Sequence, residues 1–250
     1  MANIEKMYEF LNNAIPSEFS CDWDNDGRMC ISSNREVRKV LICLDVCESV
    51  IDYAVENSFD CIISHHPLIF NSLNCFDTNQ SSGRKLAKLV KSDISVFSFH
   101  TRLDKVSGGV NDVLADIIGL NNIEDFSDVG RMGNVECSSF VDFAKDVKEK
   151  LGSDRVVCVD ANKKVSKVAI VGGSGKGYLQ EAVECGCDTF ITGEMPYNCE
   201  HDAKELGINL FCGGHYFTEN VVCERLELLV KTFDENIYTE TIKSNPSFVL

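Results

Sequence analysis

The sequence predicts a mixed α/β fold made of two related lobes. Short apolar runs rich in β-branched residues alternate with amphipathic stretches along the chain. Such alternation is typical of α/β architecture with largely parallel strands. A repeat at an offset of 128 residues, about half of the 250-residue length, indicates an internal duplication. No proline-rich or low-complexity linker separates the two halves.

The apolar runs are predicted strands because each is short and most are rich in Val and Ile. They cover residues 40–46, 61–64, 94–99, 156–159, 168–171, 190–192 and 209–212. The amphipathic stretches repeat apolar residues at helical spacing, which predicts helices. They cover residues 49–56, 84–91, 110–118, 140–151, 180–184 and 219–230. Strands and helices are therefore expected to alternate through both halves of the chain.

Seven residues recur unchanged 128 positions later. The pairs are Val40 and Val168, Ile42 and Ile170, Ala54 and Ala182, Val55 and Val183, Glu56 and Glu184, Asp60 and Asp188, and Ile63 and Ile191. Chance supplies a few such identities, because Val, Ile and Ala are common in any α/β protein. The shared Ala-Val-Glu-x-x-x-Asp pattern in a strand–helix–strand frame favours duplication. We therefore expect an N-terminal lobe over residues 1–126 and a C-terminal lobe over residues 127–250.

The charge balance and the cysteines narrow the class of protein. With 24 Lys and Arg against 39 Asp and Glu, the formal net charge of −15 disfavours a nucleic-acid backbone as the main partner. The first residues lack the apolar segment of a secretory signal, and no run approaches the roughly 20 apolar residues of a membrane span. Thirteen cysteines without a CxxC pair, mainly within apolar runs, indicate buried thiols in a reducing cytoplasm.

Four of the five histidines lie just beyond predicted strands. His65 and His66 follow the second strand, His100 follows the third, and His215 follows the last. Ligands of open α/β sheets gather beyond the carboxyl ends of the strands, so these are expected site positions. The fifth histidine, His201, lies on a helix-like stretch and is expected at the surface or behind the site.

Two carboxylates accompany these histidines. Asp104 follows the third strand closely, and Glu219 lies four residues after His215 on one face of a starting helix. Imidazole with carboxylate suits zinc, iron or manganese, and two ions about 3.5–4 Å apart can share such a set. Each residue alone has an ordinary alternative, such as a loop hydrogen bond or a surface His–Glu contact. Their combination at equivalent strand ends favours a metal site.

Three segments resemble the signatures of one protein family. They are Ile63-Ser64-His65-His66-Pro67-Leu68-Ile69-Phe70, then His100-Thr101-x-Leu103-Asp104 with Gly108-Gly109-Val110-Asn111-Asp112, and Gly214-His215-x-x-Thr218-Glu219. The segments Asp22-Trp23-Asp24-Asn25-x-Gly27 and Thr192-Gly193-Glu194 add to the likeness. The chain thus resembles the GTP cyclohydrolase I type 2 homologue family, the Nif-three-like dinuclear metal-centre proteins. It matches their short form, which lacks a central inserted domain.

The resemblance implies a dinuclear metal-dependent hydrolase of two α/β lobes with the metal site between them. It also implies two divalent ions per subunit and assembly into a toroidal homohexamer. By motif match, the metal ligands are His65, His66, Asp104, His215 and Glu219. His100 is then a close neighbour, either a proton shuttle or a residue that supports the ligands from behind. Glu194 is a second candidate for proton transfer, because the repeat aligns Gly193-Glu194 with His65-His66.

The substrate implied by the family name is GTP, opened at its imidazole ring with loss of formate. Two alternatives are a non-catalytic metal-binding or adapter protein, and a metal-dependent phosphoesterase that releases phosphate instead. The sequence departs from the common family pattern at Arg102, and at Asp26 and Arg28. These departures bear on the substrate rather than on metal binding.

Two further motifs have weaker functional interpretations. Segment 22–27 is similar to the first half of a calcium loop, but Ser33 occupies the twelfth position, so we expect a solvated acidic turn. The glycine-rich segment 172–177 fits neither the phosphate-loop spacing nor GxGxxG, so dinucleotide binding is disfavoured. Its backbone N–H groups, with Lys176 nearby, remain a candidate anion site.

Overall fold

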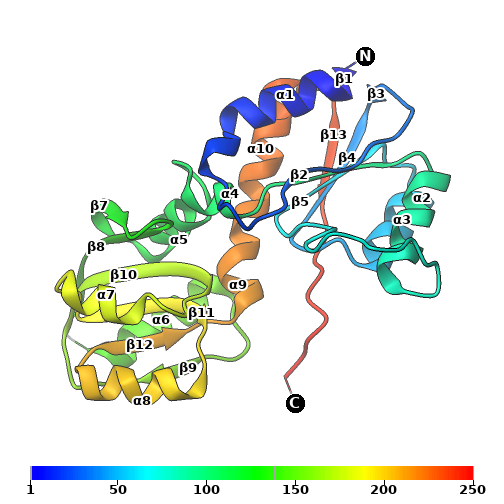
Figure 1. Cartoon of the computed structure of the whole chain (residues 1–250). Coiled ribbons are helices and arrows are strands. Elements are labelled where there is room, and N and C mark those ends of the chain that lie inside the picture. Colours follow the sequence, from blue (N-terminus) through cyan, green and yellow to red (C-terminus); the bar gives the residue numbers. More distant parts are fainter. Residues whose placement is uncertain (1, 138, 250) are drawn as a thin grey trace. The chain divides into compact units, whose positions relative to one another are not determined.

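The computed structural model describes residues 2–137 and 139–249 (Figure 1). These residues form two compact units. Unit 1 comprises residues 2–106 and 223–245, and unit 2 comprises the described residues of 107–222 and 246–249. Both units contain helices and sheets, which confirms the predicted mixed α/β fold class. Among the described residues, no helix combines the length and the apolar character needed to cross a membrane.

The sheet of unit 1 is mostly parallel. In spatial order its strands are β13 (Tyr238–Thr241), β4 (Lys39–Cys43), β5 (Cys61–Ser64), β6 (Ser95–Ser98) and the antiparallel edge strand β2 (Gly27–Cys30). The other elements are β1 (Ala2–Asn3), α1 (Ile4–Ala14), η1 (Ser17–Phe19), β3 (Glu36–Val37), α2 (Glu48–Glu56), α3 (Ser81–Lys91), α4 (Thr101–Lys105) and α10 (Cys223–Phe233). Helices α2 and α3 bury Ile51 and Leu89 against one face of this sheet.

The sheet of unit 2 is parallel at its centre and antiparallel towards both edges. In spatial order its strands are β7 (Asn121–Phe126), β8 (Gly130–Cys137), β10 (Val165–Ser174), β11 (Thr189–Glu194), β12 (Asn209–Cys212) and β9 (Val157–Val159). The helices are α5 (Val110–Ile118), α6 (Phe140–Leu151), α7 (Leu179–Glu184), α8 (Tyr197–Leu206), α9 (His215–Glu219) and the 3₁₀ turn η2 (Asn220–Val222). Helices α5 and α6 pack on one face, and α7 and α8 pack on the other.

The division into units differs from the predicted boundary after residue 126. Helix α5 belongs to unit 2, because Leu114 and Ile118 are buried in one cluster with Val168 of β10. Near its end the chain returns to unit 1, where β13 pairs in parallel with β4. The chain thus passes from one unit to the other more than once, whereas the repeat alone suggests a single boundary between two lobes.

The two units share one strand-pairing register. In unit 1, Val40 of β4 pairs with Cys61 of β5. In unit 2, Val168 of β10 pairs with Thr189 of β11, so both members of the pair move by the same 128 positions. The predicted repeat therefore corresponds to a shared strand–helix–strand structure.

An aspartate holds the start of the first parallel strand in each unit. Asp60 Oδ2 accepts a hydrogen bond from the Lys39 N–H at 2.9 Å. Asp188 Oδ2 accepts from the Lys167 N–H, also at 2.9 Å. Backbone N–H groups at a strand start need an acceptor, so this shared bond explains why the repeat keeps an aspartate at both positions.

The third parallel strand of each unit and the helix after it are also equivalent, but here the offset is 114 residues instead of 128. Ser95 of β6 pairs with Cys61, and Asn209 of β12 pairs with Thr189. A five-residue helix follows each strand, α4 in unit 1 and α9 in unit 2. The offset changes because the connection between β5 and α3 spans residues 65–80, whereas β11 and α8 are separated only by residues 195–196. Unit 1 therefore carries an extra loop directly after β5.

All the predicted strands and most of the predicted helices are confirmed, with ends shifted by a few residues. The predicted helix 219–230 is wrong as one piece, because α9, η2 and α10 divide it. The prediction missed β7, whose residues are nearly all exposed and show no apolar alternation. It also missed strand β8, the edge strands β2 and β13, and helix α1.

Candidate metal centre

The donors of unit 1 lie where β5 and β6 end. His65 and His66 follow β5 directly, and His100 precedes α4 after β6. The ring centroid of the fully buried His65 lies 5.0 Å from that of His66 and 5.3 Å from that of His100. One nitrogen from each of these rings lies within 4.8 Å of the others. Three of the predicted site histidines therefore form one cluster that can hold a metal ion.

The Nδ1 atom of each ring in this cluster faces an oxygen acceptor. The contacts are 2.9 Å from His65 to the Phe99 carbonyl, 2.7 Å from His66 to Asp45 Oδ1, and 2.8 Å from His100 to Asp24 Oδ1. A proton at Nδ1 donates to each acceptor, so the lone pair of the neutral imidazole lies at Nε2. Metal-binding histidines are commonly oriented by such an acceptor behind the ring.

Asp104 adds a carboxylate to the same unit. It lies on α4, and its Oδ1 is 3.6 Å from His65 Nε2. His100 is the N-cap residue of this helix, and its backbone carbonyl accepts a hydrogen bond from the Leu103 N–H at 2.7 Å. The backbone position of His100 therefore sets both where its own ring lies and where the helix that carries Asp104 starts.

Asp24 is buried, so the prediction of a solvated acidic turn is wrong for this residue. Its side chain has no exposed surface, and its Oδ2 accepts from the Thr101 N–H at 3.0 Å and from the Thr101 hydroxyl at 2.6 Å. Burial acts to raise the pKa of the carboxyl group. Hydrogen bonds from His100 and Thr101 outweigh burial and hold the pKa of Asp24 well below its usual range. The charged carboxylate thereby orients His100 and the first turn of α4.

Asp26 is buried in the same turn and forms an ion pair with Arg102. The Arg102 Nε donates to Asp26 Oδ2 at 3.0 Å, and the side chains are only 1% and 6% exposed, respectively. The guanidinium also donates to Asn12 Oδ1 at 2.8 Å and to the Ile15 carbonyl at 3.1 Å. The His100 N–H donates to the same Asp26 oxygen at 3.3 Å. This pair therefore ties α1, the acidic turn and the start of α4 together.

The donors of unit 2 lie on α9, directly after β12. His215 and Glu219 share one face of this helix, with Nε2 of the histidine 3.0 Å from Oε2 of the glutamate. The His215 Nδ1 faces Glu194 Oε1 at 3.2 Å. The predicted starting helix and its i,i+4 pair are present, and Glu194 lies behind the His215 ring.

The two contacts of His215 favour a cation at this pair. With its proton at Nδ1 facing Glu194, the neutral ring presents its Nε2 lone pair to the Glu219 carboxylate. A lone pair and a carboxylate 3.0 Å apart repel each other unless a proton or a metal ion relieves the repulsion. His215 and Glu219 therefore fit a divalent metal ion by their chemistry, as the imidazoles and carboxylate of unit 1 do.

Glycines make the room for this donor pair. A Cβ at Gly173 would overlap the Glu219 carboxylate and come within 3.1 Å of His215 Nε2, and the backbone there has φ +63°. A Cβ at Gly193 would lie 2.8 Å from the His215 Cα. Part of the glycine-rich segment 172–177 is thus explained by close packing against α9.

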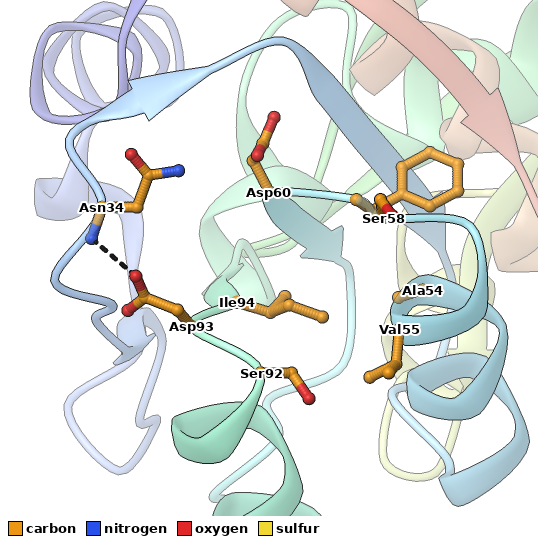
Figure 2. A pocket seen from close by; sticks show the side chains of 9 residues that line it. Asn34, Ala54, Val55, Ser58, Asp60, Ser92, Asp93 and Ile94 are labelled. Carbon is orange, nitrogen blue, oxygen red and sulfur yellow. Dashed lines mark hydrogen bonds between the residues drawn. The ribbon is translucent and has the colours of Figure 1, made fainter.

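A cavity of about 350 Å³ lies elsewhere in unit 1, before β5 and β6 begin (Figure 2). Its acidic lining residues are Asp60 and Asp93. Asp60 accepts from backbone N–H groups at the start of β4, and Asp93 accepts from the Asn34 N–H at 3.1 Å. Both carboxylates therefore stabilise loops at the amino ends of the strands, while the histidines follow the carboxyl ends.

The structure places every predicted site residue beside donors of its own unit. His65, His66, His100 and Asp104 gather in unit 1, and Glu194, His215 and Glu219 gather in unit 2. Sequence reasoning missed Asp45 and Asp24 as partners of the histidines. The signal for Asp45 is a charged residue inside the apolar run 40–46, at the carboxyl end of a strand.

Comparisons with known proteins agree with these observations. The family model described as Duf34/NIF3 (NGG1p interacting factor 3) matches residues 2–247. A Clostridium perfringens protein named GTP cyclohydrolase 1 type 2 homolog is 31% identical over 238 residues, covering 91% of each chain. A Helicobacter pylori protein named GTP cyclohydrolase 1 type 2 is 29% identical over 249 residues, covering 98% of each chain.

A solved structure extends the likeness to the fold. The crystal structure of Staphylococcus aureus protein SA1388 has a TM-score of 0.90 and 29% sequence identity. The alignment covers 100% of this chain and 99% of that chain. The match of the family model over nearly the whole length confirms the resemblance seen in the histidine motifs. The chain therefore belongs to the Duf34/NIF3 (NGG1p interacting factor 3) family.

Proposed function

We propose that this protein is a metal-dependent hydrolase with two divalent ions per chain. The proposed ligands are His65, His66, Asp104, His215 and Glu219. One observation carries the proposal: the Nδ1 of each of these histidines faces an acceptor within its own unit. That arrangement supports Nε2 as the ligand atom in every case.

Divalent ions held by such donors supply Lewis-acid activation of water near neutral pH. His100 is outside the proposed ligand set, and its Nδ1 is held by Asp24. Its Nε2 is therefore the atom proposed to take up and release the proton of the reaction. Glu194 is the second candidate for proton transfer, since its carboxylate is mostly exposed and contacts His215.

The names of the relatives support a nucleotide as the substrate. The Helicobacter pylori relative is named GTP cyclohydrolase 1 type 2, and it is similar to this chain over nearly the full length. We therefore propose hydrolytic opening of the imidazole ring of GTP, or of a related nucleotide, with release of formate. A phosphoesterase acting on the same nucleotide would release phosphate instead.

A second candidate function is that of a metal-binding adapter protein without turnover. The observation in its favour is the family description, which names an interacting factor rather than an enzyme. Several relatives are also named only as homologs of the cyclohydrolase. An adapter would bind metal through the same residues and would need no proton-transfer group.

The deciding experiment measures formate and phosphate release from GTP by the metal-loaded protein. The matched variants are His100→Ala and His201→Ala. His201 is an exposed histidine on α8 whose Nε2 contacts the Tyr197 hydroxyl at 2.9 Å. We expect formate release that His100→Ala reduces and His201→Ala leaves unchanged. Phosphate alone would indicate the phosphoesterase, and no turnover of any nucleotide would favour the adapter.

Two expectations from the sequence stay predictions. Assembly into a homohexamer is tested by light scattering, with six copies of the 27.8 kDa chain as the expected mass.

A cytoplasmic location is expected from the cysteine content, and fractionation of cells tests it. Burial raises the pKa of the Cys212 thiol to about 12 and that of Cys187 to about 11, so both stay protonated at neutral pH.

A further inference from the structure

We propose that Trp23 and Phe70 form a stacking surface for the heteroaromatic base of the substrate. This inference rests on the proposed function and names the part of the substrate that unit 1 recognises. Trp23 is 64% exposed and Phe70 is 46% exposed, although both are large aromatic side chains. Paired exposed aromatics beside a cluster of potential metal ligands are typical of ligand sites rather than of a random surface.

The geometry connects the aromatic pair to the histidine cluster. The ring centroids of Trp23 and Phe70 lie 6.0 Å apart. The His100 ring meets Trp23 at 6.2 Å and Phe70 at 6.1 Å, edge-on in both cases. His100 in turn lies 5.6 Å from His66, measured between ring centroids. The planes of the two aromatic rings are tilted by 58°, so a base stacked on one ring would meet the other at an angle. Either position lies next to the proposed proton-transfer group.

The loop that carries Trp23 is held firmly. Its neighbour Asp24 is buried and bound by His100 and Thr101. The Cys21 N–H donates to the Thr101 hydroxyl at 2.9 Å, on the other side of Trp23. The exposure of the indole is thus imposed by a fixed backbone, and a fixed aromatic surface binds a flat ligand at a small entropic cost.

Phe70 lies in the loop that distinguishes unit 1 from unit 2. Residues 65–80 connect β5 to α3, whereas the equivalent connection in unit 2 spans residues 195–196. The Asn25 side-chain amide donates to the Ile69 carbonyl, which fastens this loop to the one that carries Trp23. The added loop therefore places its aromatic residue beside the indole and the donors of unit 1.

The ligand class follows from the chemistry of the two rings. Every nucleobase has a flat π-face, and stacking on an aromatic side chain contributes about 1–3 kcal/mol per base. Phosphates have no such face, and a ribose ring presents a smaller and less flat surface to Trp23 or Phe70 than a base does. The pair therefore selects the base of a nucleotide and leaves the rest of the substrate to other groups.

Trp23 is the only tryptophan in the sequence, so its fluorescence reports directly on this surface. The experiment titrates the full-length protein with guanosine monophosphate and, as a control, with ribose 5-phosphate. We expect guanosine monophosphate to quench the emission and ribose 5-phosphate to leave it unchanged. An emission that responds to protein concentration but not to the nucleotide would indicate coverage by a second copy and overturn the proposal.

Calorimetry then measures the nucleotide affinity of Trp23→Leu and Phe70→Leu, which keep an apolar side chain but remove the ring. We expect each to weaken binding of guanosine monophosphate by on the order of tenfold. Trp23→Phe should restore most of the affinity. The control is Tyr197→Leu, an exposed aromatic residue of α8 in unit 2 (72% exposed), and it should bind as the unmodified protein does.

The outcomes separate this inference from the proposed function. Binding is read without turnover, so a protein that stacks the base but releases no formate would contradict the hydrolase alone. Metal-dependent turnover combined with unchanged nucleotide affinity in both leucine variants would contradict the stacking surface alone. Metal content is measured in each variant, so that a loss of donors is not mistaken for a loss of stacking.

Discussion

Arg102 and Asp26 form a buried ion pair, with the guanidinium Nε 3.0 Å from the carboxylate oxygen. The two residues are 76 positions apart in the sequence, so their pairing is a tertiary contact. The structure shows that they are partners. A buried charge needs its counter-charge, so each residue of the pair requires the other. The pair also holds the backbone of His100, next to the donors of unit 1.

The first prediction concerns this pair. Arg102→Met leaves the Asp26 carboxylate without its counter-charge, and Asp26→Val does the reverse. Each single variant should lower the free energy of unfolding by about 3–5 kcal/mol. The double variant should recover most of that loss, because neither charge remains. Urea unfolding of all four proteins measures the coupling, and losses that simply add would contradict the assigned partnership.

The second prediction concerns the pH dependence that Asp24 contributes. Its pKa in the folded protein is below its usual range, so the folded state binds fewer protons than the unfolded state near pH 4. The stabilisation is complete above the unfolded pKa of about 3.9 and is lost as the pH falls towards the folded value. Asp24→Asn should therefore show a smaller loss of stability on acidification. Urea titrations at pH 3–6 in EDTA test this, and equal slopes would exclude Asp24.

The third prediction uses two glycines of one segment. Gly173 and Gly177 both have positive φ, but a Cβ at Gly177 meets nothing within 4 Å. Gly177→Ala should cost only the backbone strain, about 1–2 kcal/mol. Gly173→Ala adds a clash with Glu219 and should also impair metal binding. Thermal unfolding with metal analysis compares the two variants, and similar behaviour would refute the packing role of Gly173.

The fourth prediction concerns the acceptors behind the histidine rings. Asp45→Asn should lower metal affinity by about 10–100-fold, because the carboxylate orients His66 and strengthens its basicity. Asp52→Asn on α2 is the matched control, since that exposed aspartate contacts Lys88 instead. Competition with a chelating dye measures affinity. Equal values for the two variants would mean that Asp45 has no part in metal binding.

The fifth prediction separates the two roles open to Glu194. Its carboxylate faces His215 Nδ1, so Glu194→Gln is expected to weaken metal binding. At saturating metal, a purely orienting residue should leave turnover nearly unchanged, whereas a proton carrier should not. Turnover measured with full metal occupancy therefore decides the assignment. We expect slower turnover under these conditions, and an unchanged rate would remove Glu194 from proton transfer.

Much of the fold is readable from the sequence because local signals match the final structure. The apolar run at residues 61–64 forms β5, and the helix predicted over residues 140–151 forms α6. The repeat predicts the shared register, since Val40 and Val168 occupy equivalent places. The return of the chain to unit 1 was not predictable. The apolar periodicity of β13 is weak, and periodicity does not show that β13 pairs with β4.

Only part of the candidate site could likewise be predicted from the sequence. A histidine directly after an apolar strand is recognisable in the sequence, so His65 and His215 could be found from position and chemistry alone. The groups behind them could not, because a buried Asp24 and a solvated aspartate look alike in a sequence. Only tertiary contacts show that the polar turn of residues 22–27 is folded against α4, where burial and hydrogen bonding replace water.

Counting the bound ions shows whether the histidines and carboxylates hold metal. The protein is dialysed against zinc, iron or manganese and then against metal-free buffer, and the retained ions are counted by mass spectrometry. We predict two ions per chain in the unmodified protein and fewer in His65→Ala and in His215→Ala, with His201→Ala unaffected. A folded protein that retains no ion under any of these conditions would show that these residues do not form a metal centre.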